Sequence, residues 1–132
     1  MPELYTRPAW DSYFLAIAHA VALRVDCRRR RVGCVIVDGQ KRIVATGYNG
    51  TAPGKDGCLS GACPRGHLSY TQQPEFQGYE NCIAVHAEVN ALLWAKSAGE
   101  TAYVTAKPCP ACSNALIAAG ITRVVCPPTI DD

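Results

Sequence analysis

The chain has 132 residues, of which 48% are hydrophobic and 18% are charged, and its formal net charge is +2. This length suits a single domain (1–132) with a core of its own, and the composition excludes an intrinsically disordered chain. The small net charge indicates no strong electrostatic partner, although Arg24 and the run 28–31 concentrate positive charge locally.

The first predicted element is a helix over 8–26, where apolar side chains recur near helical spacing. These side chains are Trp10, Phe14, Ile17, Val21 and Val25. A short β-branched run over 31–37 predicts a strand, and the dipeptide 38–39 (Asp-Gly) after it is a hairpin signal. A second strand is expected over 42–50.

The second half of the chain opens with an irregular segment and then alternates in type. Residues 51–81 contain five glycines and three prolines without any periodic pattern, so this insertion is expected to be functional or held by an added constraint. Helices are predicted over 85–97 and 110–120, and strands over 101–106 and 121–126. This order predicts right-handed crossovers over a partly parallel sheet.

The expected location of the protein indicates which chemical state its eight cysteines have. No apolar stretch approaches the roughly 20 residues of a membrane span. The first thirty residues lack a signal-peptide pattern, because His19 and other polar residues interrupt the apolar stretches. We therefore expect a cytoplasmic protein without a membrane partner, in which cysteines are more often metal ligands or buried thiols than disulfides.

Two short motifs open the two later helices. His86 and Glu88 begin the first, and Cys109 and Cys112 begin the second, where a spacing of three places both thiols on one face. One histidine and two cysteines leave a tetrahedral zinc ion with one open position, as in catalytic sites. Glu88 is then free to move protons to and from water at that position.

Each motif alone has other interpretations. A histidine before an apolar helix is usually structural, and a lone CxxC motif after a strand also suits a thioredoxin-like redox pair. Their joint occurrence favours zinc, since HxE with PCxxC is the signature of zinc-dependent nucleobase deaminases.

With these motifs and the stretches "VGCVIV", "IVATGYNG" and "AGITRVV", the chain over about 10–126 resembles the cytidine deaminase superfamily, and within it the deoxycytidylate (dCMP) deaminases. The resemblance implies a three-layer α/β/α fold, with a mixed sheet of four to five strands and helices on both faces. It also implies a zinc-dependent hydrolase that converts dCMP to dUMP and ammonia, with His86, Cys109 and Cys112 on zinc and Glu88 as the proton shuttle.

The same resemblance implies a sugar contact for Asn49 of "GYNG", although an asparagine beside a glycine also suits a plain turn. Arg31 could bind the 5′-phosphate, because arginine offers a planar, permanently charged fork, or could belong to a solvated face. The family tends to have an aromatic residue where this chain has Cys126, which puts a base-stacking role there in doubt. We expect a small nucleotide as substrate and no nucleic-acid partner, since a polynucleotide deaminase needs a longer basic track with stacking platforms.

A second, structural zinc ion is predicted for the insertion. Its expected ligands are Cys27, Cys58, Cys63 and Cys82, with His67 as a substitute for one of them. The resemblance supports Cys27 and Cys58, because some viral relatives use matching cysteines. Four reduced thiols without metal are the alternative.

The sequence also bears on whether the protein forms an oligomer and on which other functions it could have. Members of the resembled family form oligomers around alanine-rich helices, so we expect at least a dimer. The alanines concerned are Ala111, Ala115, Ala118 and Ala119. A deaminase of another nucleobase compound and a non-enzymatic zinc domain are the alternatives to a dCMP deaminase.

Overall fold

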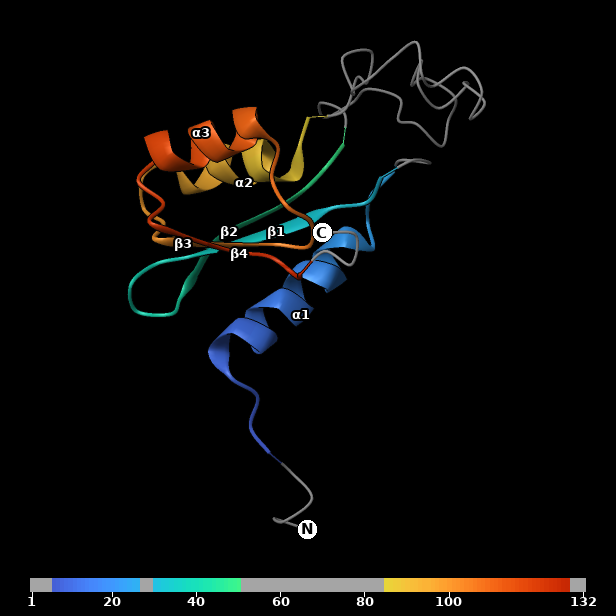
Figure 1. Ribbon diagram of the computed structural model, residues 1–132, viewed down its shortest axis with the longest axis vertical. Coiled ribbons are helices and arrows are strands. Elements are labelled where there is room, and N and C mark those ends of the chain that lie inside the picture. Colours follow the sequence, from blue (N-terminus) through green and yellow to red (C-terminus); the bar gives the residue numbers. More distant parts are fainter. Residues whose placement is uncertain (1–5, 27–29, 51–84, 129–132) are drawn as a thin grey trace.

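The computed structural model describes residues 6–26, 30–50 and 85–128 (Figure 1). In chain order the elements are α1 (Trp10–Ala22), β1 (Gly33–Val37), β2 (Ile43–Tyr48), α2 (Ala87–Ala95), β3 (Thr101–Val104), α3 (Pro110–Ala118) and β4 (Arg123–Val125). Every predicted helix and strand is therefore present, each somewhat shorter than predicted. None of the described helices is long and apolar enough to cross a membrane.

The four strands form one mixed sheet in the order β2-β1-β3-β4. β1 is antiparallel to both of its neighbours, whereas β3 and β4 are parallel. Helices α2 and α3 cover one face of the sheet and α1 covers the other (Figure 1). This arrangement confirms the predicted three-layer α/β/α fold with a partly parallel sheet.

The central strand β1 explains why the sequence 33–37 is apolar without alternation. All five of its residues are buried, because helices cover both faces of the sheet. Cys34 and Ile36 pack in the cluster under α2 and α3, whereas Val35 and Val37 pack in the cluster under α1. Successive side chains of a strand point to opposite faces, so one strand supplies both cores.

Helix α1 is attached to the sheet by an apolar and a polar contact. Phe14 is buried in the cluster under α1, where its ring centroid lies 5.1 Å from that of Tyr103. The hydroxyl of Tyr103 donates to Asp11 at 2.9 Å, and the Arg123 guanidinium donates to the same carboxylate through both terminal nitrogens, with Nη1 at 2.8 Å. Residues 112 positions apart in sequence thereby connect the start of α1 to β4.

Helix α2 packs directly against the backbone of β2 at Gly47, where the absence of a side chain permits the contact. A Cβ atom at Gly47 would lie only 2.6 Å from the carbonyl oxygen of Ala87 and would also collide with the backbone nitrogen of Ala91. Both contacts are backbone atoms of α2, so a side chain there requires the whole helix to move. Gly47 therefore sets the distance between β2 and the helix that carries the predicted site.

The predicted hairpin turn is present between β1 and β2, but its conformation differs from a two-residue Asp-Gly turn. The Asp38 carboxylate accepts from the backbone N–H groups of Gln40 at 2.8 Å and Arg42 at 3.0 Å. The residue with positive φ is Lys41, at 64°, and not Gly39. The insertion predicted over 51–81 lies outside the described residues.

Candidate metal centre and active site

His86 lies between Val85, which forms a β-bridge with Gly50, and helix α2. It is the N-cap residue of that helix, with extended backbone angles (φ −64°, ψ 151°), and its side chain makes no capping hydrogen bond. The extended backbone explains why α2 begins at Ala87, two residues later than predicted. The imidazole is therefore available for another partner.

The two cysteines open helix α3 in the same way. Cys109 is the N-cap residue, Pro110 occupies the first helical turn, and the Cys109 sulfur accepts from the backbone N–H of Cys112 at 3.4 Å. Proline suits this position because its missing N–H would have no intrahelical partner there. The cap and the proline fix both thiols on one turn of chain.

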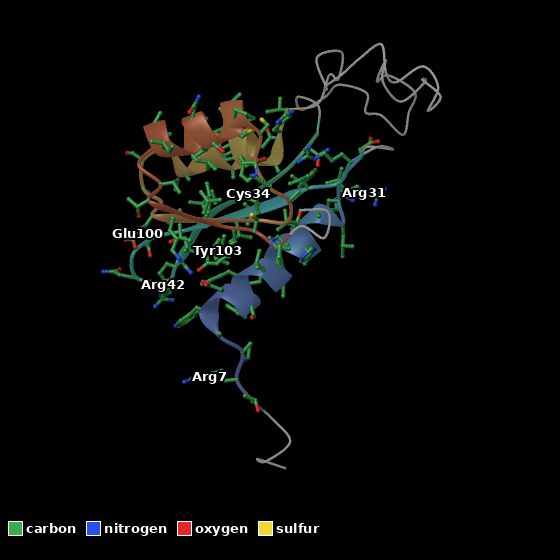
Figure 2. All side chains as sticks on the ribbon, in the orientation of Figure 1. Arg7, Arg31, Cys34, Arg42, Glu100 and Tyr103 are labelled. Carbon is green, nitrogen blue, oxygen red and sulfur yellow. The ribbon has the colours of Figure 1, made fainter. Side chains whose placement is uncertain are left out.

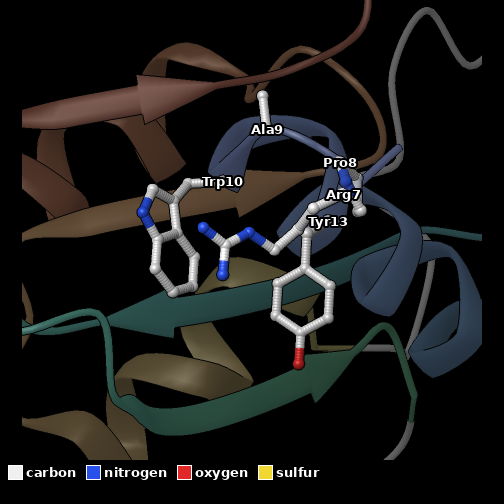
Figure 3. Close-up of a pocket in the computed structure, with 5 residues that line it drawn as sticks. All are labelled: Arg7, Pro8, Ala9, Trp10 and Tyr13. Atoms are coloured by element: carbon white, nitrogen blue, oxygen red, sulfur yellow. The ribbon is translucent and has the colours of Figure 1, made fainter. Parts of the chain in front are cut away.

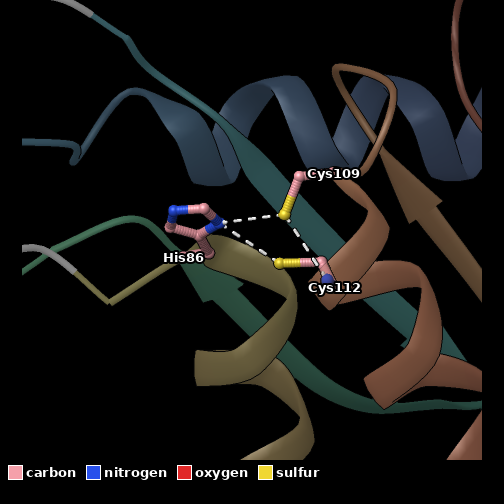
Figure 4. A group of neighbouring side chains, drawn as sticks. All are labelled: His86, Cys109 and Cys112. Atoms are coloured by element: carbon pink, nitrogen blue, oxygen red, sulfur yellow. Dashed lines mark hydrogen bonds between the residues drawn. The ribbon is translucent and has the colours of Figure 1, made fainter. Parts of the chain in front are cut away.

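The fold brings these three side chains together (Figure 4). His86 Nδ1 lies 3.2 Å from Cys112 Sγ and 3.7 Å from Cys109 Sγ. A tetrahedral zinc ion with ordinary zinc–nitrogen and zinc–sulfur bonds holds such atoms about 3.6 Å apart. Within the described ranges, this is the one group of three or more His, Cys, Asp or Glu side chains whose ligand atoms could share a metal ion. The donor set and its spacing thus fit zinc, with Nδ1 as the histidine ligand.

Glu88 lies in the first turn of α2 and only 4% of its surface is exposed. Burial raises the pKa of the Cys112 thiol to about 12, and the charge of Glu88 acts in the same direction. Burial likewise raises the pKa of the Cys34 thiol, again with the Glu88 carboxylate contributing. The carboxylate is therefore close to both sulfurs, beside the metal cluster.

Both helices direct their N-termini at the cluster, since His86 and Cys109 are their N-cap residues. The N-terminus of a helix carries a partial positive charge, which favours thiolates and carboxylates. This field opposes the raised pKa of Cys112 and would help a metal ion to displace the thiol protons.

Asn49, predicted to contact the sugar, is 7% exposed and bonded to the backbone that leads into β1. Its Oδ1 accepts from Val32 N at 2.7 Å, and its Nδ2 donates to the carbonyl oxygen of Arg30 at 2.8 Å. Asn49 thus extends the pairing of β1 and β2 by one residue. A sugar contact would use its remaining N–H or lone pair, and stays a prediction.

Arg31 is exposed and lies just before β1 (Figure 2). The neighbouring Arg30 directs a terminal nitrogen at the carbonyl oxygen of Lys107, 3.5 Å away. A phosphate contact of Arg31 stays a prediction. Of the residues predicted for the second zinc ion, Cys27, Cys58, Cys63, Cys82 and the substitute His67 all lie outside the described residues.

Cys34 of β1 is fully buried. It lies in the sheet layer (Figure 2) and packs in the cluster under α2 and α3, a position that the sequence does not predict. The sequence motifs do not point to Asn90, although it lies four residues after His86. Its spacing was the available signal, because residues i and i+4 share a helix face.

A surface pocket lies at the other end of the molecule, around the first turn of α1 (Figure 3). It is lined by Arg7, Pro8, Ala9, Trp10 and Tyr13. Helix α1 covers the sheet face opposite α2 and α3, so this pocket is separate from the metal cluster.

Comparison with known proteins agrees with this class of site, a zinc centre beside a buried carboxylate. The chain belongs to the cytidine and deoxycytidylate deaminase zinc-binding family, whose model of the zinc-binding region matches residues 8–127. The resemblance inferred from the sequence and the zinc cofactor are thereby confirmed.

Individual relatives carry the same names. A deoxycytidylate deaminase of Mycobacterium phage D29 is 49% identical over 131 residues, which span 92% of this chain and 97% of the phage protein. The deoxycytidylate deaminase of Schizosaccharomyces pombe is 44% identical over 123 residues, but these cover 90% of this chain and 37% of that longer protein. The dCMP deaminase of cyanophage S-TIM5, solved in complex with dCMP and dUMP, superposes with a TM-score of 0.68 at 26% identity, over 92% of this chain and 83% of the other.

Proposed function

We propose that the protein deaminates dCMP by hydrolysis, so that dCMP and water give dUMP and ammonia. The observation that carries this proposal is the cluster of His86, Cys109 and Cys112 beside the buried Glu88. The 49% identity to a phage deoxycytidylate deaminase over nearly the whole of both chains supports dCMP as the substrate. The dCMP and dUMP bound to the cyanophage enzyme support the same substrate and product.

The residues divide the work between holding an ion and moving protons. His86 Nδ1 and the two thiolates would hold zinc, which supplies Lewis acidity and lowers the pKa of bound water to about 7. Glu88 takes a proton from the attacking water and delivers it to N3 of the cytosine. It then takes the proton of the hydroxyl group now on C4 and delivers it to the amine, which leaves as ammonia. A buried carboxylate suits this work, because the surrounding protein keeps it at a fixed position and limits competing solvent.

Substrate recognition is assigned to the chain around the start of β1. Asn49 would contact the sugar with the hydrogen-bonding capacity that its two backbone partners leave over. Arg31, exposed at the same edge, would bind the 5′-phosphate. A small free nucleotide in the cytoplasm is the proposed substrate, rather than cytosine within a nucleic acid.

We also propose that the protein is a homo-oligomer. The outer side of α2 and α3 exposes large apolar side chains, with Trp94 79%, Ile117 69% and Leu93 62% exposed. Ala111 and Ala118 of α3 are exposed, and Ala115 and Ala119 are half-buried, so small residues lie beside these large ones. A second copy packed there would remove this apolar surface from water. Light scattering at micromolar concentration, which should give at least twice the chain mass, tests this.

The deciding experiment is ammonia release by the purified, zinc-loaded protein from dCMP, CMP, dCTP, deoxycytidine and single-stranded DNA. The highest kcat/KM is expected with dCMP. A clear preference for another compound would move the protein to the alternative class of nucleobase deaminases. Zinc binding without ammonia release from any of them would indicate a non-catalytic zinc domain.

A further inference from the structure

Asn90 contacts the backbone on both sides of the junction between β2 and α2. Its side-chain Nδ2 donates to the carbonyl oxygen of Tyr48 at 2.8 Å and to that of Val85 at 3.3 Å. Its backbone N–H donates to the carbonyl oxygen of His86 at 2.9 Å. The bond to His86 is an ordinary helical backbone bond, so what the Asn90 side chain itself adds is a link between the end of β2 and the residue before a metal ligand.

The same junction carries a short antiparallel bridge. Gly50 N donates to the Val85 carbonyl oxygen at 3.0 Å, and Val85 N donates back to Gly50 at 2.7 Å. The Val85 oxygen thus accepts from both Gly50 and Asn90. Val85 is therefore held by Gly50, which follows β2, and by Asn90 of α2.

The histidine ligand depends on this junction more than the cysteines do. The two thiols share one turn of α3, where the cap bond from Cys112 N to Cys109 Sγ relates them directly. His86 comes from another helix, has an extended backbone and makes no side-chain cap bond. The direction of its ring therefore follows from where the backbone at 85–86 is held.

We propose that Asn90 is a positioning residue of the metal centre. Through its bonds to Tyr48 and Val85 its side chain holds the backbone that leads into His86, and so keeps Nδ1 within 3.2 and 3.7 Å of the two sulfurs. Residues that orient metal ligands in this indirect way typically change metal affinity by about 10- to 100-fold when they are replaced. The inference rests on the zinc site of the proposed function, but not on the identity of the substrate.

The test compares zinc affinity, measured by chelator competition, for the wild type, Asn90→Ala and Asn90→Asp. Alanine removes both donated hydrogen bonds, and aspartate keeps the size but opposes two carbonyl oxygens with a carboxylate. Both variants should bind zinc about 10- to 100-fold more weakly. Their cobalt(II) forms should show shifted d–d absorption bands, because the geometry at the histidine ligand changes. Asn114→Ala is the matched control: Asn114 is an exposed asparagine on α3, two residues after Cys112, and its loss should leave affinity and spectrum unchanged.

Several outcomes would overturn the proposal. Unchanged zinc affinity and cobalt spectrum would do so, and so would a raised KM for dCMP at wild-type zinc affinity, which would place Asn90 on the substrate. Should Asn90→Ala not fold, Asn90→Ser retains one donor and replaces it in the series. If neither Asn90→Ala nor Asn90→Ser folds, Asn90 is needed for folding and the proposed role at the metal centre is overturned. A wild-type protein that binds zinc without deaminating anything would defeat the proposed function and leave this experiment valid.

Discussion

Glu88 in the first turn of α2 and Cys112 in the first turn of α3 are both buried, and burial together with the charge of Glu88 raises the pKa of the Cys112 thiol. The carboxylate proposed to move protons thus acts electrostatically on a residue proposed to hold the metal. The two residues lie in the first turns of two different helices, so separate segments of the chain form one reaction centre.

Replacement of Glu88 by glutamine should separate catalysis from metal binding. The amide keeps the size of the side chain but cannot take up a proton, so kcat for dCMP should fall by about 10²- to 10⁴-fold or more. Zinc content, measured by atomic absorption, should stay at the wild-type value. Wild-type turnover in this variant would refute the proton-shuttle role.

The three proposed ligands should each be needed for the metal. His86→Ala, Cys109→Ala and Cys112→Ala should lower both bound zinc and ammonia release, because two ligands hold zinc far more weakly than three. Cys126→Ala is the control, since this half-buried cysteine lies beyond β4 and outside the cluster. Full metal content in all three ligand variants would show that the catalytic zinc lies elsewhere.

Gly47→Ala should push α2 away from β2. The added Cβ meets backbone atoms of Ala87 and Ala91, so the clash cannot be relieved by rotating a side chain. Chemical denaturation should show a loss of about 1–3 kcal/mol of unfolding free energy. Activity should also fall, because α2 carries His86 and Glu88.

Gly39→Ala serves as the control for this change. A Cβ there would meet the end of the exposed Glu100 side chain at 2.6 Å, and that side chain can rotate away. Equal loss of stability in the two variants would contradict the argument from helix packing.

The contact between Asp11 and Arg123 should make stability depend on acid pH. Hydrogen bonding to Arg123 lowers the pKa of Asp11 from 3.8 to about 2. A depressed carboxyl pKa adds stability above pH 3.8, and this contribution is lost as the pH falls from about 4 to about 2. The effect should be small, because both side chains are substantially exposed to solvent.

The measurement is Tm against pH for the wild type and Arg123→Ala. The difference between the two curves should be present at pH 5 to 7 and shrink below pH 4. Arg42→Ala, which removes an exposed arginine from the hairpin loop, is the charge-matched control. A difference that does not change with pH would show that Arg123 acts by packing and not through the Asp11 carboxylate.

Metal analysis tests the second zinc ion predicted for Cys27, Cys58, Cys63 and Cys82. Protein expressed with ample zinc should contain about two ions per chain, one in each site, since a four-thiolate site is a closed structural one. Cys58→Ser should remove one ion and leave the His86 site loaded. A ratio near one in the wild type would rule the second site out.

The sequence alone determined the class of site and the order of the elements. The HxE and PCxxC motifs carry the metal donors and the carboxylate within a few residues of one another, and apolar periodicity marks helices and strands locally. The β-branched run 31–37 predicted a strand, whereas its coverage on both faces became evident only from the burial of all five residues of β1.

The tertiary structure decided how distant segments meet. Periodicity says nothing of partners, so the bonds of Asn49 to Arg30 and Val32 and those of Asn90 to Tyr48 and Val85 could not be predicted. The pairing of Asp11 with Arg123 is of the same kind. Each of these contacts exists because the sheet order places separate chain segments side by side, and that order depends on long-range packing of both faces and not on any local pattern.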